Sequence, residues 1–157
     1  MVPPRALIAL IQRFEGLRLR AYTCPAGVWT CGWGSTGPDV TPATEWTREQ
    51  ADARLMLDAQ AATIAAAKLC PKAEGDELAA LADFAYNLGA TRLAGSTLRR
   101  RFNAGDLVGA RREIQRWVYG GGRKLPGLVL RRAAEAALLG SARKTEIQAQ
   151  PAGAQGG

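Results

Sequence analysis

The stretch FEGLRLRAYTCPAGVWTCGWGST, residues 14–36, decides how the chain is organised. Glu15 lies at the end of an apolar run with helical spacing, and Gly16 stops that run. Cys24 and Thr30 follow among several glycine turns. No other segment brings a lone carboxylate, a thiol and a hydroxyl so close together. The stretch is therefore predicted to carry the chemistry, and the rest of the chain to hold it in place.

Composition limits the kind of chemistry. The chain has 157 residues, of which 47% are hydrophobic, which suits one domain with a buried core. It contains no histidine, so Ser–His and Cys–His nucleophile pairs are excluded and a zinc site is disfavoured. Its three cysteines are an odd number and do not indicate a disulfide framework. Acid–base catalysis would rest on carboxylates, helped by a hydroxyl or thiol.

Net charge and hydropathy bear on partners and location. The net charge of +7 favours an anionic partner, such as nucleic acid or a bacterial envelope, although a basic surface can also serve solubility alone. The apolar run at residues 6–11 is too short to span a membrane, and no signal-peptide cleavage site follows it. We expect a soluble protein made in the cytosol.

The pattern of apolar and turn residues predicts an α+β fold in one domain, residues 1–140. A small β-containing lobe is expected over about 15–46 and a helical lobe over about 70–140, joined by a long helix with a cleft between the lobes. The tail from Ser141 to Gly157 is predicted to be disordered. Helices are expected at 5–14, 47–69, 76–88, 96–103, 106–118 and 127–139, a small hairpin or sheet within 18–33, and loops at 37–46 and 119–122.

The candidate residues each have an alternative interpretation. A carboxyl packed against apolar side chains favours its protonated form and can donate a proton, but Glu15 could simply pair with Arg18 or Arg20. If the chain reverses near residues 26–27, Thr30 returns beside Cys24 on the neighbouring strand. Taken singly, a buried cysteine usually acts as a small hydrophobe, and threonine is a common strand residue.

The joint spacing is more specific. Eight residues separate Glu15 from Cys24, and five separate Cys24 from Thr30, within Glu15-Gly-Leu-Arg-Leu-Arg-Ala-Tyr22 and Gly27-Val-Trp-Thr-Cys-Gly-Trp-Gly-Ser-Thr36. This motif resembles the bacteriophage lysozyme (endolysin) family, glycoside hydrolase family 24, in which the second position is Asp or Cys. The resemblance extends over about residues 6–140. Its downstream parts are Phe84-Ala-Tyr-Asn-Leu-Gly89, residues 96–106, Arg116-Trp117, Gly121-Gly122 and residues 127–135.

The resemblance implies a lysozyme-like fold and a muramidase. Such an enzyme hydrolyses the β-1,4 bond between N-acetylmuramic acid and N-acetylglucosamine in peptidoglycan and lyses the host cell. Glu15 would be the general acid, and Cys24 and Thr30 would position or activate the attacking water. The family's inverting outcome fits this arrangement, because inverting glycosidases leave roughly 6.5–9.5 Å between their two groups. Cys24 could instead attack the sugar carbon as a thiolate, with retention.

Further roles follow from the same resemblance. We expect Arg131 or Arg132 either to reach Glu15 across the cleft or to belong to a solvated basic face, and Trp29 to pack the small lobe. Ser35 replaces a family histidine that pairs with an acidic group across the lobes, so a contact should be lost. Cys31 should point away from the site, leaving a disulfide with Cys24 only as a redox switch, and Cys70 should be structural. The expected substrate-binding residues are Tyr22, Trp33, Thr36, Arg131 and Arg132.

Expected partners complete the hypothesis. No cofactor or nucleic acid is implied. The enzyme is expected to be a monomer that stays in the host cytoplasm until a holin releases it to the periplasm and cell wall, unless an N-terminal anchor has been removed.

Two other functions stay open, a lytic transglycosylase with a lone Glu and a basic non-enzymatic binder. An arginine cluster in the helical lobe is expected to attract the anionic envelope; it comprises Arg99, Arg100, Arg101, Arg111, Arg112 and Arg116.

Overall fold

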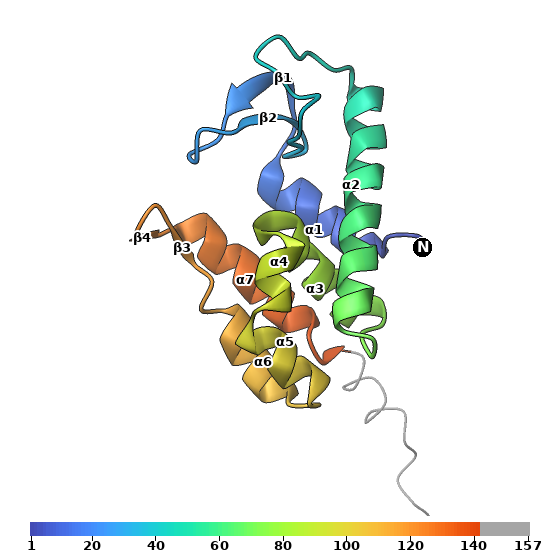
Figure 1. The fold of residues 1–157 in the computed structure, drawn as a ribbon, viewed down its shortest axis with the longest axis vertical. Coiled ribbons are helices and arrows are strands. Elements are labelled where there is room, and N and C mark those ends of the chain that lie inside the picture. The colour runs from blue at the N-terminus through green and yellow to red at the C-terminus, as the bar shows by residue number, and fades with distance from the viewer. Residues whose placement is uncertain (142–157) are drawn as a thin grey trace, which may run out of the picture.

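The computed structural model describes residues 1–141 and shows a small β lobe and a helical lobe (Figure 1). Helix α2 runs from the β hairpin at one end towards the helical cluster at the other (Figure 1). The elements in chain order are α1 Arg5–Glu15, β1 Arg18–Thr23, β2 Trp29–Gly32, α2 Arg48–Leu69, α3 Gly75–Leu88, α4 Ala90–Ala94, α5 Thr97–Asn103, α6 Leu107–Ile114, β3 Tyr119–Gly120, β4 Arg123–Lys124 and α7 Pro126–Leu138.

Helix α1 ends at the residue on which the site depends. Leu7, Leu10 and Ile11 are buried with the spacing of one helical face, so that face packs into the core. Gly16 then adopts a φ of 69°, a left-handed conformation that few residues other than glycine accept. Glu15 is therefore the last helical residue, and the chain turns directly after it into β1.

The small lobe is built on the antiparallel pair β1–β2. Tyr22 lies opposite Thr30 and Thr23 opposite Trp29, and the register shifts between Arg18 and Tyr22. In that interval the backbone of β1 bonds to residues 44–46 instead. The predicted small sheet is confirmed, and part of the expected loop at 37–46 contributes to it.

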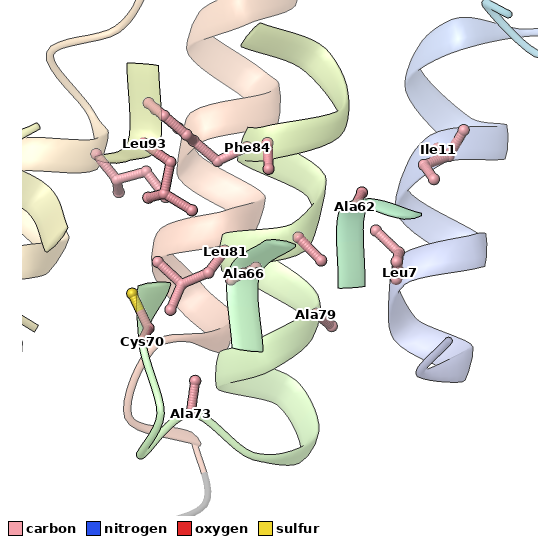
Figure 2. Close-up of a cluster of buried hydrophobic side chains, with 14 of the residues drawn as sticks. Leu7, Ile11, Ala62, Ala66, Cys70, Ala73, Ala79, Leu81, Phe84 and Leu93 are labelled. Atoms are coloured by element: carbon pink, nitrogen blue, oxygen red, sulfur yellow. The ribbon is translucent and has the colours of Figure 1, made fainter. Parts of the chain in front are cut away.

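Helix α2 joins the lobes and α3 lies at the centre of the helical one. Thr47 and Gln50 form the predicted capping box at the start of α2, and α2 ends as expected before Cys70. Helix α3 packs against α1, α2, α4 and α7. Figure 2 shows the resulting core, in which side chains from α1, α2 and α3 meet; among them are Leu7, Ile11, Ala62, Ala66, Leu81 and Phe84.

Three details differ from the expectation. The helix predicted over 106–118 ends at Ile114, because the chain turns there towards the β3–β4 hairpin. That hairpin, at residues 119–124, replaces a predicted loop, and the short helix α4 was not predicted. The predicted tail lies outside the described residues from position 142 onward. Among the described helices, none has both the length and the apolar character needed to cross a membrane.

Candidate active site

Glu15 is fixed by a buried arginine from the helical lobe. The Nη1 atom of Arg131 in α7 donates to Oε1 of Glu15 at 2.6 Å. The same guanidinium makes two further bonds, each of 2.8 Å, to the two carboxylate oxygens of Asp83 in α3. Although burial opposes its charge, these bonds and the charges of Asp83 and Glu15 raise the pKa of Arg131 above its ordinary value. Arg131 therefore stays charged and locked in place.

The other carboxylate oxygen of Glu15 faces a glycine of the small lobe. Gly34 follows β2 and has a φ of 82°. A methyl group at Gly34 would lie 2.6 Å from Oε2 of Glu15, closer than atoms can approach without moving. Gly34 thus meets two requirements, a left-handed backbone and room for the carboxylate. The side chain of Glu15 is 21% exposed, so it is held from both lobes yet open to solvent.

Cys24 and Thr30 meet at one carbonyl oxygen of the hairpin. The carbonyl of Val28 accepts a bond from the Cys24 N–H at 3.0 Å and another from the Thr30 hydroxyl at 3.0 Å. The chain reverses between them, where the Gly27 N–H donates to the carbonyl of Cys24 at 2.8 Å. Thr30 is buried and Cys24 half-buried. The predicted reversal of the chain near residues 26–27 is confirmed, and it brings the Thr30 hydroxyl close to the backbone of Cys24.

Tyr22 connects this hairpin to Glu15. It lies opposite Thr30 in the register, and Cys24, two residues further along, shares its face of the strand. Burial raises the pKa of the Tyr22 phenol, and the nearby charge of Glu15 raises it further, with a smaller contribution from Cys24. The guanidinium of Arg18 lies 4.4 Å from the Tyr22 ring centroid. Glu15, Tyr22 and Cys24 are therefore neighbours in one electrostatic environment.

A groove lies between the lobes. It has a volume of about 290 Å³ and is lined by the loop 34–36, by Asp58 and alanines of α2, and by Tyr86 of α3. Gly34 belongs both to the lining of the groove and to the contact with Glu15, so the acid lies next to the groove. The Tyr86 hydroxyl crosses the lobes and donates to the carbonyl of Trp33 at 2.7 Å. This is a concave site next to a fixed carboxylate.

Comparisons with known proteins agree with this geometry. The family model described as phage lysozyme matches residues 12–135, most of the described chain. The chain belongs to the phage lysozyme family. An endolysin from Acyrthosiphon pisum secondary endosymbiont phage 1 is 39% identical over 86% of this chain and 95% of its own, and a SAR-endolysin from Bacteriophage PS119 is 36% identical over 77% and 73%.

Solved structures show the same family fold. An endolysin from Escherichia coli O157:H7 phage FAHEc1 superposes with a TM-score of 0.78, at 33% identity over 90% of this chain and 95% of that one. The muramidase domain of SpmX from Asticaccaulis excentricus gives 0.77, at 32% identity over 86% and 95%. The predicted phage lysozyme family, lysozyme-like α+β fold and muramidase class of enzyme are confirmed.

The structure leaves some of the predicted substrate-binding residues exposed and buries others. Trp33 is buried and its Nε1–H donates to Asp52 of α2 at 2.7 Å, so its ring is closed to a sugar. Trp29, expected to pack the small lobe, is instead 37% exposed. Arg132, also in the predicted set, is fully buried. Thr36 is exposed and lines the groove, as its predicted role requires.

Two further expectations are corrected or refined. Ser35 does not lose the contact between the lobes, because its hydroxyl donates to Asp58 of α2 at 2.6 Å. Glu15 pairs with Arg131, as one interpretation held, and neither Arg18 nor Arg20 bonds it; Arg20 pairs with Glu45. Cys24, Cys31 and Cys70 are free thiols, the last two fully buried.

Sequence reasoning missed the residues that support the acid. Asp83 interrupts the apolar run of α3, and a single charge there is a usable signal because such a residue must find a buried partner. Gly34 stands in the quoted motif without an assigned role. Nothing in the pattern pointed to the contact that Tyr86 makes. Within residues 1–141, no group of three or more His, Cys, Asp or Glu side chains is arranged to hold a metal ion.

Proposed function

We propose that this phage endolysin hydrolyses the β-1,4 bond between N-acetylmuramic acid and N-acetylglucosamine, with Glu15 as general acid. The observation that carries the proposal is the position of Glu15. Its carboxylate is bonded by Arg131 at 2.6 Å and lies against Gly34, which lines the groove between the lobes, and it is close to Tyr22 of the hairpin. A carboxyl so placed can protonate the leaving oxygen of a sugar chain that occupies the groove.

Thr30 is proposed to orient the attacking water. Its hydroxyl donates its only proton to the Val28 carbonyl, so towards a water molecule it can act only as an acceptor. A water that donates to Thr30 directs its oxygen lone pairs elsewhere, including towards the sugar carbon. Cys24, on the same hairpin, would take the second proton of that water.

Substrate contacts are proposed for Tyr22 and Thr36, with Arg131 acting through Glu15. Tyr22 lies beside both Glu15 and Cys24, and Thr36 lines the groove. Both positions suit a saccharide, which combines ring faces for stacking with hydroxyls for hydrogen bonding. Trp33 and Arg132 are left out of the proposed set because they are buried.

The decisive experiment is clearing of outer-membrane-permeabilised Gram-negative cells, with mass spectrometry of the released muropeptides. We expect wild type to clear the cells and release muropeptides with reducing ends. Glu15→Gln should lose activity by about 100-fold or more, and Cys24→Ser should be impaired. Anhydro-muropeptides, or full activity of Cys24→Ser, would favour a lytic transglycosylase with a lone acid. A folded wild type that binds sacculi without cleaving them would favour a non-enzymatic binder.

Access to the cell wall is a separate proposal. We expect a holin to release a monomeric enzyme from the host cytoplasm to the periplasm and cell wall. Expression of the full chain in a bacterial host, with and without a co-expressed holin, tests this directly. Lysis only with the holin supports the proposal. Lysis without it would favour export by another route, and SAR-endolysins stand among the similar proteins.

The basic helical lobe is proposed to attract the anionic envelope. Arg99 is not free for this, since it donates to the carbonyls of Leu69 and Ala94. The exposed members of the cluster, on α5 and α6 and just after them, are Arg100, Arg101, Arg112 and Arg116, with Arg111 half-buried. Long-range attraction of this kind is screened by salt, so the clearing rate should fall steeply between low and moderate ionic strength. A constant rate would contradict it.

A further inference from the structure

Arg131 poses a problem for the acid that it holds. A positive charge 2.6 Å from Glu15 stabilises the carboxylate and works against the protonated form. The general acid of the proposed function must carry a proton when the substrate arrives. Arg131 is 3% exposed, so water screens its charge poorly. Another group has to offset this charge if Glu15 is to donate a proton near neutral pH.

Asp83 occupies the position from which the charge can be offset. It is fully buried in α3 and bonds the Arg131 guanidinium at both oxygens, Oδ2 to Nε and Oδ1 to Nη2, each at 2.8 Å. The third nitrogen, Nη1, is left for Glu15. This two-pronged pairing also fixes the plane of the guanidinium, and hence the direction of its bond to Glu15.

The residue that follows Arg131 in α7 forms a second buried ion pair. Arg132 donates to Glu135 at 2.7 Å and to the side-chain oxygen of Asn87 at 2.9 Å. Burial raises the pKa of Glu135 well above its ordinary value although Arg132 opposes this, and Asp83 adds to the rise. Helices α3 and α7 are thus joined by the Arg131–Asp83 ion pair and by the hydrogen bond from Arg132 to Asn87, while the Arg132–Glu135 pair lies within α7.

We propose that Asp83 is a positioning residue for catalysis, which balances the charge of Arg131 so that Glu15 can carry a proton while held in a fixed orientation. The inference rests on the proposed function of Glu15 as general acid. Asp83 does not touch the substrate; it acts through Arg131. The arrangement separates two effects of Arg131, because its hydrogen bond orients Glu15 while the carboxylate of Asp83 reduces its electrostatic effect.

Other charged or titratable groups surround Glu15 and Asp83, and none replaces Asp83. They comprise Arg18 and Tyr22 of β1, Cys24 after β1, Asp58 of α2, Tyr86 of α3, and Arg131, Arg132 and Glu135 of α7. Of the carboxylates in this set, Asp58 is already bonded to Arg54 and Ser35, and Glu135 to Arg132. Asp83 is the carboxylate that shares Arg131 with Glu15.

The test is the pH dependence of kcat/KM on purified peptidoglycan, whose alkaline limb reports the group that must be protonated in the free enzyme. Asp83→Asn leaves the charge of Arg131 unbalanced, so the alkaline limb should move about one pH unit lower. Arg131→Gln should move it the opposite way, and the double variant should return close to wild type. Asp83→Glu keeps the negative charge beside Arg131, so the alkaline limb should stay at the wild-type pH. Its kcat should be lower.

The matched control is Asp106→Asn, which removes another aspartate that pairs with an arginine, Arg101, far from Glu15 along the chain. Its alkaline limb should not move. If Asp83→Asn does not fold, Arg131→Gln and the double variant still isolate the charge of Asp83. The limb of Arg131→Gln must then lie at higher pH than that of the double variant.

If the alkaline limbs of the folded Asp83 and Arg131 variants stay at the wild-type pH and only kcat falls, by the same factor at every pH, the inference is overturned. Asp83 is then a structural residue. That failure differs from failure of the proposed function. The proposed function fails if wild type releases no reducing ends or if Glu15→Gln stays active. The inference fails when wild type releases reducing ends and Glu15→Gln is inactive, as expected, but the alkaline limb of the Asp83 and Arg131 variants does not move.

Discussion

The two sides of Glu15 are built in different ways. On the helical side, Arg131 and Asp83 are buried, 3% and 0% exposed, and every bond between them and Glu15 is between 2.6 and 2.8 Å. On the hairpin side, Cys24 is half-buried at the end of β1, and the turn beyond it is exposed. Glu15, the proposed proton donor, is thus oriented by the core, while Cys24 and Thr30, the proposed water-activating groups, rest on main-chain bonds of a hairpin. Changes on the helical side should affect stability and activity together, and changes on the hairpin should affect activity alone.

The largest expected effect comes from closing the space around the acid. Gly34→Ala places a methyl group 2.6 Å from Oε2 of Glu15 and should displace the carboxyl. Displacement of a catalytic group by about 1 Å can cost roughly 100-fold in rate, and we expect that loss of kcat in the sacculus assay. The matched control is Gly105→Ala, at a φ of 80° with open space around it.

Both glycine variants carry a similar backbone cost of about 1–2 kcal/mol, because each forces alanine into a left-handed conformation. Thermal unfolding should therefore report comparable destabilisation, while only Gly34→Ala loses activity out of proportion. Equal activity losses would show that the contact with Glu15 does not matter.

The hairpin side gives the next effect. Cys24→Ser should lower kcat by about tenfold or more with little change in melting temperature, because the thiol lies outside the core. Cys24→Asp should keep activity and become insensitive to thiol reagents that inactivate wild type. Cys31 and Cys70, both fully buried, should not react until the protein unfolds. Inactivation of Cys24→Asp by the same reagents would assign the sensitivity to another thiol.

The contact between the lobes should give a smaller effect. Tyr86→Phe removes the hydroxyl that donates to the Trp33 carbonyl at 2.7 Å, and leaves that carbonyl without this donor. We expect a loss of about 1 kcal/mol in the free energy of unfolding, measured by denaturant titration. Tyr119→Phe, at an exposed tyrosine, is the control and should be neutral. Equal stability of the two variants would mean that the Tyr86 bond contributes nothing net.

An effect of similar size, confined to alkaline pH, is a pH dependence of stability in the core. Burial raises the pKa of the Cys70 thiol to about 11, so the unfolded chain loses this proton at lower pH than the folded protein. The contribution of Cys70 is complete below the unfolded pKa and is lost as pH rises towards the folded one. Between pH 9 and 10 the stability of wild type should fall by about 1 kcal/mol more than that of Cys70→Ala. Parallel pH profiles would contradict this.

The two sides also differ in how far the sequence predicted them. The hairpin was predictable because its residues are local: the spacing of Cys24 and Thr30 and the turn at Gly27 lie within a few positions. The helices followed from apolar spacing and from caps such as the Thr47–Gln50 box. The helical side of the site depends on contacts between distant positions, such as Arg131 with Glu15 and Asp83. No local pattern specifies these, and Arg131 was found only through the family resemblance.

The tryptophans show the same limit. Whether Trp29 or Trp33 is open to solvent depends on where α2 lies against the small lobe, because Asp52 of α2 accepts the Trp33 indole N–H. Periodicity within the strand does not contain that information. The sequence therefore did not show that Trp33 is the more buried of the two.

The stereochemistry of the product tests the central claim most directly, namely that Glu15 protonates the leaving group while water activated at Cys24 and Thr30 attacks from the hairpin side. Proton NMR on a fresh digest of a soluble peptidoglycan oligosaccharide reports the new anomeric centre before it equilibrates. Direct attack by water on a β-linked substrate inverts that centre, so the account predicts the α anomer first. Initial appearance of the β anomer would contradict it and would make Cys24 a nucleophile.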